Sequence, residues 1–309
     1  MKRGLVIKST GKLYHVKADD GSMIHCQIKG KLRLKNVVTT NPIAAGDVVE
    51  YEPEPNSQGS IVSIVPRKNY IIRKSVNLSK EAQIVAANID MLFLVVTIAR
   101  PQTSAGFIDR FLASAEAYEV PASIVFHKMD QYNEKEAAKV EELIGLYTRI
   151  GYPCLRTSLV DGRGLEEMKE KMQGGVNLFS GHSGTGKSSL INYFIPGLEL
   201  KTAEISDWSD KGQHTTTFSE LHALPFGGYI ADTPGIKGFG LVDIPVEEVH
   251  HHFREFFQLL PKCRFANCRH TNEPGCAVRE AVATGEVAES RYKSYLSILE
   301  DESERSTYR

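Results

Sequence analysis

The segment GHSGTGKS, at residues 181–188, decides the fold of this 309-residue chain. It matches the pattern of a phosphate-binding loop, G-x4-G-K-[S/T], between a strand-like stretch (176–179) and a helical stretch (187–194). The glycines let backbone N–H groups face phosphates, and the helix start adds its dipole. We expect Lys187 to reach the β- and γ-phosphates of a nucleotide, and Ser188 to bind Mg²⁺. The expected nucleotide-binding residues of this segment are Gly181, His182, Ser183, Gly184, Thr185, Gly186, Lys187, Ser188 and Ser189.

Two further motifs follow the phosphate-binding loop. Asp232 begins the tetrapeptide DTPG directly after a predicted strand at 229–231, where its carboxylate can hold Mg²⁺ through water and the N–H of Gly235 can donate to a γ-phosphate. Between these motifs lies KGQHTTT (211–217), in which one of Thr215, Thr216 and Thr217 can complete the Mg²⁺ shell and sense the γ-phosphate. The start of a threonine-rich strand is the alternative interpretation.

A base-reading motif precedes the phosphate-binding loop. GTP-binding proteins read guanine with N-K-x-D, and this chain has HKMD at 127–130, after a predicted strand at 123–126. In this motif the carboxylate accepts from the guanine N1–H and amine, and the Lys stem packs on the base. The residues concerned are His127, which stands where Asn is usual, Lys128, Met129 and Asp130. Thr157 and Ser158 begin a weaker match to the S-A-x contact of the same proteins.

The order of these motifs is itself informative. Ras-like GTPases place the phosphate-binding loop first and the guanine motif later, whereas here the guanine motif comes first. A spatial site survives when a chain is cut and rejoined at surface loops. We therefore expect a circularly permuted GTPase domain, in which the segment after Gly235 leads directly into the C-terminal domain.

The rest of the chain indicates three domains. Short strand-like stretches separated by turn signals (4–7, 13–16, 23–28, 48–51, 60–65) predict a small closed barrel of the oligonucleotide/oligosaccharide-binding (OB) class over residues 1–68. Alternating strand and helix patterns predict an α/β GTPase domain with a mostly parallel sheet over 69–240. Residues 241–309 read as a helical domain with a final helix at 286–299 and a frayed tail.

Cysteine spacing predicts a metal site in that helical domain. Cys263, Cys268, His270 and Cys276 offer three thiolates and one imidazole within 14 residues, which favours a closed structural Zn²⁺ site over a catalytic one. Unligated cysteines are the alternative. The neighbouring run 250–252, three histidines, reads as helix surface, and Cys26 and Cys154 read as core residues.

Composition and charge exclude several classes of protein. Hydrophobic residues make up 41% and charged residues 24%, which excludes wholesale disorder, and we find no apolar run long enough to span a bilayer and no signal peptide. The net charge of −1 hides an asymmetry, because residues 1–40 hold nine Lys and Arg against two acids and the rest is acidic. This basic stretch fits either solvated strand edges or a face that contacts nucleic-acid phosphates.

The chain resembles the ribosome small subunit-dependent GTPase A family. The features that carry the resemblance are GHSGTGKSS (181–189), HTTT (214–217), DTPG (232–235) and the Cys/His cluster. The family pattern has Val where Thr185 stands and Arg where Gln213 stands. The resemblance implies an rRNA-binding OB barrel and a GTPase that turns GTP into GDP, is stimulated by the small ribosomal subunit and acts late in its maturation. It also implies one structural Zn²⁺ per chain, Mg²⁺ with GTP, and a monomeric cytoplasmic protein without a membrane partner.

The catalytic residues are predicted less directly. Ile236 follows DTPG, so the polar residue that commonly positions water is absent. We hypothesise that His214 orients the attacking water, while Lys187 stabilises charge on the transferred phosphoryl group. The alternatives are a non-catalytic GTP-regulated RNA-binding module, a small-molecule kinase and a permuted GTPase of the large subunit. Asp130, DTPG and the predicted barrel argue against the kinase.

Overall fold

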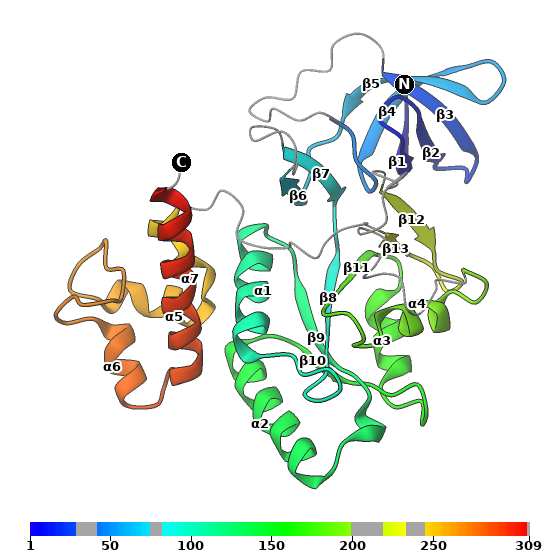
Figure 1. Ribbon diagram of the computed structural model, residues 1–309. Coiled ribbons are helices and arrows are strands. Elements are labelled where there is room, and N and C mark those ends of the chain that lie inside the picture. The colour runs from blue at the N-terminus through cyan, green and yellow to red at the C-terminus, as the bar shows by residue number, and fades with distance from the viewer. Residues whose placement is uncertain (29–41, 75–81, 199–218, 233–244, 308–309) are drawn as a thin grey trace.

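The computed structural model describes residues 1–28, 42–74, 82–198, 219–232 and 245–307. Figure 1 shows a barrel near the N-terminus, an α/β unit in the middle and a small helical unit beside helix α1. No helix in the described ranges is long and apolar enough to cross a bilayer.

The N-terminal barrel consists of β1 (Lys2–Ser9), β2 (Tyr14–Ala18), β3 (Met23–Ile28), β4 (Val48–Glu54) and β5 (Gln58–Ile64). The strands follow the order β1-β2-β3-β5-β4, and a further pairing of β1 with β4 closes the ring. Only β3 and β5 run parallel among these pairs. The barrel core consists of Val6, Tyr14, Val16, Ala18, Cys26, Ile43, Val49, Tyr51 and Ile61. The predicted five-stranded OB-like barrel is confirmed.

The central unit is a three-layer α/β/α arrangement. Its sheet has the order β10-β9-β8-β11-β13-β12, made of β8 (Met91–Val96), β9 (Ala122–Phe126), β10 (Cys154–Arg156), β11 (Val176–Ser180), β12 (Glu220–Ala223) and β13 (Tyr229–Asp232). The pairs from β10 to β13 are parallel, and β12 is antiparallel to β13. Helices α1 (Ala105–Ala117) and α2 (Glu134–Ile150) pack on one face, whereas α3 (Leu165–Met172) and α4 (Lys187–Phe194) pack on the other. Strands β9 and β11 are buried along their whole length because both faces are covered.

The C-terminal unit is helical. It contains η3 (Val246–His252), α5 (Arg254–Leu259), η4 (Leu260–Lys262), α6 (Ala277–Ala283) and α7 (Glu289–Thr307). Its core includes Phe253, Phe256 and Tyr295, and Ala113 of α1 packs into the same cluster. Figure 1 shows α7 running alongside α1, so the C-terminal unit lies against the layer of helices that covers this face of the central sheet.

Three elements differ from the sequence-based expectation. A hairpin of β6 (Tyr70–Lys74) and β7 (Ala82–Ala87) joins the barrel to the central unit, although strand–helix alternation was expected from residue 70. Strand β12 was missed, because ELHA has too little alternation to be read as a strand. Helix α7 continues through most of the tail predicted to fray, since the tail contains neither Gly nor Pro.

The barrel and the central unit share one continuous sheet. Lys8 of β1 pairs with Glu220 of β12 in the backbone ladder, and their side chains form an ion pair of 2.5 Å. Nearby, Lys17 donates to the Tyr229 hydroxyl at 3.1 Å. The barrel therefore abuts the strand that follows the threonine-rich segment.

Candidate functional site

The phosphate-binding loop connects β11 to α4, as the motif predicts. Gly184 and Gly186 have φ of +79° and +99°, a region that L side chains rarely adopt. A Cβ on Gly181 would lie 2.1 Å from the Val95 carbonyl oxygen, so only glycine fits at this position. The loop therefore turns tightly enough to bring its backbone N–H groups to the start of α4.

Internal hydrogen bonds hold this loop in shape. The Lys187 ammonium donates to the carbonyls of Gly181 and His182 at 2.8 and 2.6 Å. The Thr185 hydroxyl donates to the His182 carbonyl at 2.9 Å, and both Thr185 and Ser188 are buried. Ser183 is exposed and Ser189 half-buried. The loop thus keeps the Lys187 charge close to its own backbone.

The base-reading motif lies beside this loop. Lys128 reaches across it, and its ammonium donates to the Gly184 carbonyl at 2.7 Å and to the Arg100 carbonyl at 3.1 Å. Asp130 is exposed and accepts from the Ser158 hydroxyl at 2.6 Å. The Met129 N–H donates to the Thr157 carbonyl at 3.2 Å. Segments 127–130, 157–158 and 181–188, which are distant in sequence, therefore form one site.

Ser158 and Thr157 have separate partners in this site. Ser158 orients the Asp130 carboxylate, whereas the Thr157 Oγ1 lies 2.9 Å from Nδ1 of His127. The sequence predicted that this segment lies beside the base-reading motif, and these two contacts place it there.

His127 is buried between the two loops, with a side chain that faces Thr157 on one side and Gly186 on the other. Burial, with a smaller effect of the neighbouring Lys128, lowers the pKa of His127 from 6.5 to about 4. The ring is therefore neutral at physiological pH.

The remaining predicted nucleotide residues are described only in part. Asp232 ends β13, whose residue Ala231 pairs with Leu178 of β11, so the backbone of Asp232 lies at the same sheet edge as the phosphate-binding loop. The Asp232 side chain lies outside the described set. His214, Thr215, Thr216 and Gly235 also lie outside the described residues.

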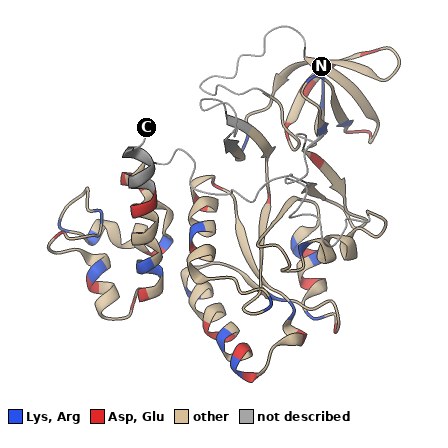
Figure 2. Ribbon diagram, in the orientation of Figure 1, with Lys and Arg blue, Asp and Glu red and all other residues tan. Residues whose placement is uncertain are grey.

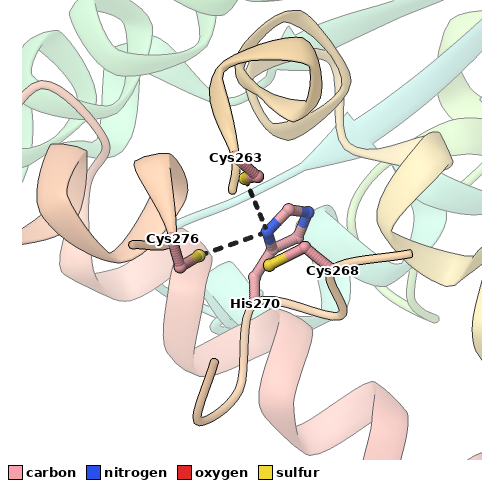
Figure 3. A group of neighbouring side chains, drawn as sticks. All are labelled: Cys263, Cys268, His270 and Cys276. Carbon is pink, nitrogen blue, oxygen red and sulfur yellow. Dashed lines mark hydrogen bonds between the residues drawn. The ribbon is translucent and has the colours of Figure 1, made fainter. Parts of the chain in front are cut away.

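The predicted metal ligands come together in the C-terminal unit (Figure 3). The ligand atoms of Cys263, Cys268, His270 and Cys276 all lie within 4.8 Å of one another. Nδ1 of His270 lies 3.7 Å from Sγ of Cys263 and 3.3 Å from Sγ of Cys276. Ligands at 2.0–2.3 Å from a tetrahedral Zn²⁺ are separated by roughly 3.5 Å, so the donor set and its spacing fit that ion.

The surroundings of the cluster also favour a cation. Burial raises the pKa of the Cys268 and Cys276 thiols, and a divalent cation is what stabilises such buried thiolates. The backbone is fixed from outside, since Tyr292 donates to the His270 carbonyl at 2.7 Å and Tyr295 to the Arg269 carbonyl at 2.6 Å. The cluster could therefore hold a metal ion such as zinc.

One residue near this cluster differs from expectation. His250 was predicted on the helix surface, but it is 4% exposed, and its ring centroid lies 5.1 Å from that of His270. Nδ1 of His250 and Nε2 of His270 are both buried without a hydrogen-bond partner in the described structure. His250 lies on the seven-residue 3-10 helix η3, whose three-residue period differs from the α-helical period assumed for this run, and its side chain faces inward. Cys26 is in the barrel core as predicted, whereas Cys154 is only half-buried.

Helix α1 connects the nucleotide site to the C-terminal unit. At its start, the ring of Phe107 lies 3.9 Å, centroid to centroid, from that of His182 in the phosphate-binding loop. Two residues later, Asp109 forms a buried ion pair of 2.9 Å with Arg291 of α7. Near its end, Glu116 pairs with Arg254 of α5 at 2.8 Å. The same helix therefore contacts both the phosphate-binding loop and the C-terminal unit.

The barrel carries charges of both signs in its described part (Figure 2). Arg3 and Lys8 are paired with Glu50 and Glu220. Four of the nine basic residues that make residues 1–40 positive, at positions 29, 31, 33 and 35, lie outside the described residues.

Known protein families match nearly the whole chain. The RsgA GTPase family model matches residues 64–242, and the RsgA N-terminal domain model matches residues 3–61. The small ribosomal subunit biogenesis GTPase RsgA of Bacteroides fragilis is 55% identical over 302 residues, covering 98% of this chain and 97% of that protein. Small ribosomal subunit biogenesis GTPase RsgA 2 of Bacteroides thetaiotaomicron is 54% identical, with the same coverage.

Solved structures agree with the fold. YjeQ from Thermotoga maritima has a TM-score of 0.80 and 39% identity, covering 97% of this chain and 98% of that one. YloQ, described as a circularly permuted GTPase, has a TM-score of 0.76 and 27% identity, covering 99% of this chain and 96% of that one. The predicted permutation is confirmed by this match and by the order of β9 before β11. On its motifs, its geometry and these matches, the chain belongs to the RsgA GTPase family.

Proposed function

We propose that this protein hydrolyses GTP to GDP and phosphate during late maturation of the small ribosomal subunit. The observation that carries the proposal is the single site formed by the phosphate-binding loop and by Asp130, which Ser158 orients for base recognition. The names of the relatives, small ribosomal subunit biogenesis GTPases, support the biological context. Stimulation of hydrolysis by the small subunit is part of the same proposal.

Base recognition belongs to the loops at 127–130 and 157–159. The Asp130 carboxylate accepts from the guanine N1–H and amine, which adenine does not offer in that arrangement. Lys128 contributes its aliphatic stem against the base, and the Leu159 N–H is placed to donate to the guanine oxygen. Thr157 and Ser158 act by holding the first loop. GTP is therefore preferred over ATP.

Phosphate recognition belongs to the loop at 181–188. Its N–H groups and the Lys187 ammonium neutralise charge on the β- and γ-phosphates. Ser188, Asp232 and Thr215 or Thr216 are the residues that would hold Mg²⁺, which neutralises further charge on the phosphates when bound. Gly235 donates its N–H to the γ-phosphate. On release of GDP, Lys187 returns to the carbonyls of Gly181 and His182.

The hydrolytic step needs a residue that orients water for in-line attack on the γ-phosphorus. His214 carries this role in the proposal, because Ile236 after DTPG offers no polar group. Replacing His214 with alanine then abolishes subunit-stimulated turnover and leaves the Kd for GTP unchanged. Stimulated turnover at the wild-type rate in the variant would exclude His214.

The proposal assigns a separate role to each of three domains. Residues 1–68 bind rRNA, residues 69–240 bind and hydrolyse GTP, and residues 241–309 are stabilised by one structural Zn²⁺ on Cys263, Cys268, His270 and Cys276. The protein works as a cytoplasmic monomer. A structural zinc fits this site because four protein ligands leave no position for a substrate.

A direct experiment measures GTP turnover alone and with purified small or large ribosomal subunits, together with co-sedimentation in GDP or a non-hydrolysable GTP analogue. We expect stimulation and co-sedimentation with small subunits only. Stimulation by large subunits, or near-zero turnover under every condition, would contradict the proposal. The second result would favour a non-catalytic GTP-regulated module.

A further inference from the structure

His127 stands where GTP-binding proteins usually have asparagine, and the structure shows what the imidazole contacts. Its side chain is 3% exposed. Its backbone is fixed at both ends, because the His127 N–H donates to the Val96 carbonyl at 2.9 Å and its carbonyl accepts from the Tyr132 hydroxyl at 2.8 Å. The ring therefore has one defined position, set by the end of β9.

One edge of the ring meets Thr157, at the end of β10. Nδ1 lies 2.9 Å from the threonine Oγ1, and that hydroxyl lies 3.5 Å from the Phe126 carbonyl, to which it can only donate. The Oγ1 is then free to accept from the Nδ1–H of a neutral imidazole. This arrangement leaves the lone pair on Nε2, at the opposite edge of the ring.

That opposite edge meets the phosphate-binding loop. A Cβ built on Gly186 would lie 2.5 Å from Cδ2 and 2.9 Å from Nε2 of His127, so the ring occupies the space beside this glycine. Gly186 is the residue directly before Lys187 and caps α4. The imidazole thus spans from β10 to the start of the helix that presents Lys187.

The neighbouring Lys128 reaches a different point of the same loop, the Gly184 carbonyl. The two residues together touch the loop on either side of Thr185, which is itself buried. Neither contact involves Asp130, which faces solvent and is held by Ser158. The contacts of His127 with the loop are therefore separate from base reading by Asp130.

We infer that His127 is a positioning residue that joins the base-reading loop to the phosphate-binding loop through Thr157 and Gly186, and that it does not read the base. This inference rests on the proposed GTP site and specifies how its two halves are kept in register. The ring replaces the amide of asparagine with a longer, flat group that fills the space next to Gly186. Loss of the ring loosens the loop and weakens binding of every nucleotide that uses the phosphate-binding loop.

The test compares nucleotide affinities of the full-length protein and its variants, measured by displacement of a fluorescent GDP. His127→Ala is expected to raise the Kd for GTP, GDP and ITP alike by about tenfold, the equivalent of one lost buried hydrogen bond with its packing. ITP lacks the guanine amine, so the ratio of the Kd for ITP to the Kd for GTP reports base reading. That ratio stays at the wild-type value in His127→Ala and falls towards one in Asp130→Ala.

Two further variants separate positioning from a general loss of folding. His127→Asn restores an amide and is expected to bind within about threefold of wild type, whereas Thr157→Val removes only the hydrogen-bond partner and gives an intermediate Kd. His25→Ala, an exposed histidine on β3, is the matched control. An unchanged Kd in His127→Ala, a shifted ITP/GTP ratio, or failure of asparagine to restore binding would each overturn the inference. Failure of the wild-type protein to bind guanine nucleotides would instead reject the proposed function.

Discussion

Replacing Arg291 with methionine is expected to weaken the attachment of the C-terminal unit to the nucleotide-binding unit. The Arg291 side chain is 1% exposed and bonds to Asp109 of α1 at 2.9 Å and to Glu255 of α5 at 2.7 Å. Its guanidinium also lies 4.5 Å from the centre of the Phe253 ring. Methionine keeps most of the aliphatic stem that packs there and removes only the charge and its hydrogen bonds.

The expected loss of stability follows from the buried Asp109 carboxylate, which loses its partner in the variant. Asp109 is fully buried, one of its carboxylate oxygens has no hydrogen-bond partner among the described residues, and the other would keep only the Tyr147 hydroxyl at 2.8 Å. Removing one partner of such a buried pair costs about 3–5 kcal/mol. At about 2–4 °C per kcal/mol for a domain of 150–250 residues, the melting temperature should fall by roughly 6–20 °C.

The assay is thermal unfolding of the zinc-loaded protein, followed by calorimetry and by hydrogen exchange of α7. Arg279→Met, at an exposed arginine of α6, is the matched control and should change the melting temperature by no more than about 2 °C. The double variant Asp109→Asn/Arg291→Met removes both charges and should be more stable than Arg291→Met alone. A melting temperature of Arg291→Met equal to that of the control, or a double variant that is less stable than the single one, would refute the reasoning.

Three other predictions follow from the two sites. Because His127 has a folded-state pKa of about 4 against 6.5 when unfolded, the unfolded chain binds more protons than the folded one between these pH values. The stability of the wild type should therefore fall as the pH drops from 6.5 to 4, and in His127→Asn this fall should be smaller by up to about 3 kcal/mol. Denaturant titrations at several pH values measure the difference. Asp130→Asn should change the nucleotide preference from GTP to XTP, since an amide can donate to the xanthine carbonyl that replaces the guanine amine. Competition binding with both nucleotides checks this change, and a retained preference for GTP counts against Asp130 as the base reader. Elemental analysis should find one zinc per chain. The variant His250→Ala, which removes the ring packed on His270, should lose its zinc to a chelator several-fold faster than the wild type. Equal rates of zinc loss would show that His250 does not support the metal.

Much of this fold could be predicted because its signals are local. The capping box of Asn133 with Glu136 and the left-handed Gly151 bound α2 by contacts within a few residues of its ends. The phosphate-binding loop is equally local, since its glycines serve backbone geometry within eight residues. The metal cluster also depends on spacing within 14 residues, and its four ligands lie together as expected.

What could not be predicted depends on contacts between distant segments. The Ser158–Asp130 hydrogen bond could not be predicted, because no property of Ser158 alone distinguishes it from Thr157 as the partner of Asp130. Strand β12 is a strand because β13 and β1 flank it, not because its four residues favour that state. His250 is buried against His270, a residue 20 positions away, and a helix-surface reading of three consecutive histidines does not reveal such a contact.

The pairing of β1 with β12 also has a consequence for the order of events during synthesis. Lys8 and Glu220 are 212 residues apart, so a ribosome adding about 5–20 residues per second needs on the order of 10–40 s to deliver the second strand after the first. The barrel is complete at residue 64 and has time to close on its own before its partner strand exists. During that interval the edge of β1 at Lys8 lacks its partner strand β12. A lysine on an exposed strand edge disfavours pairing with the strand of another nascent chain.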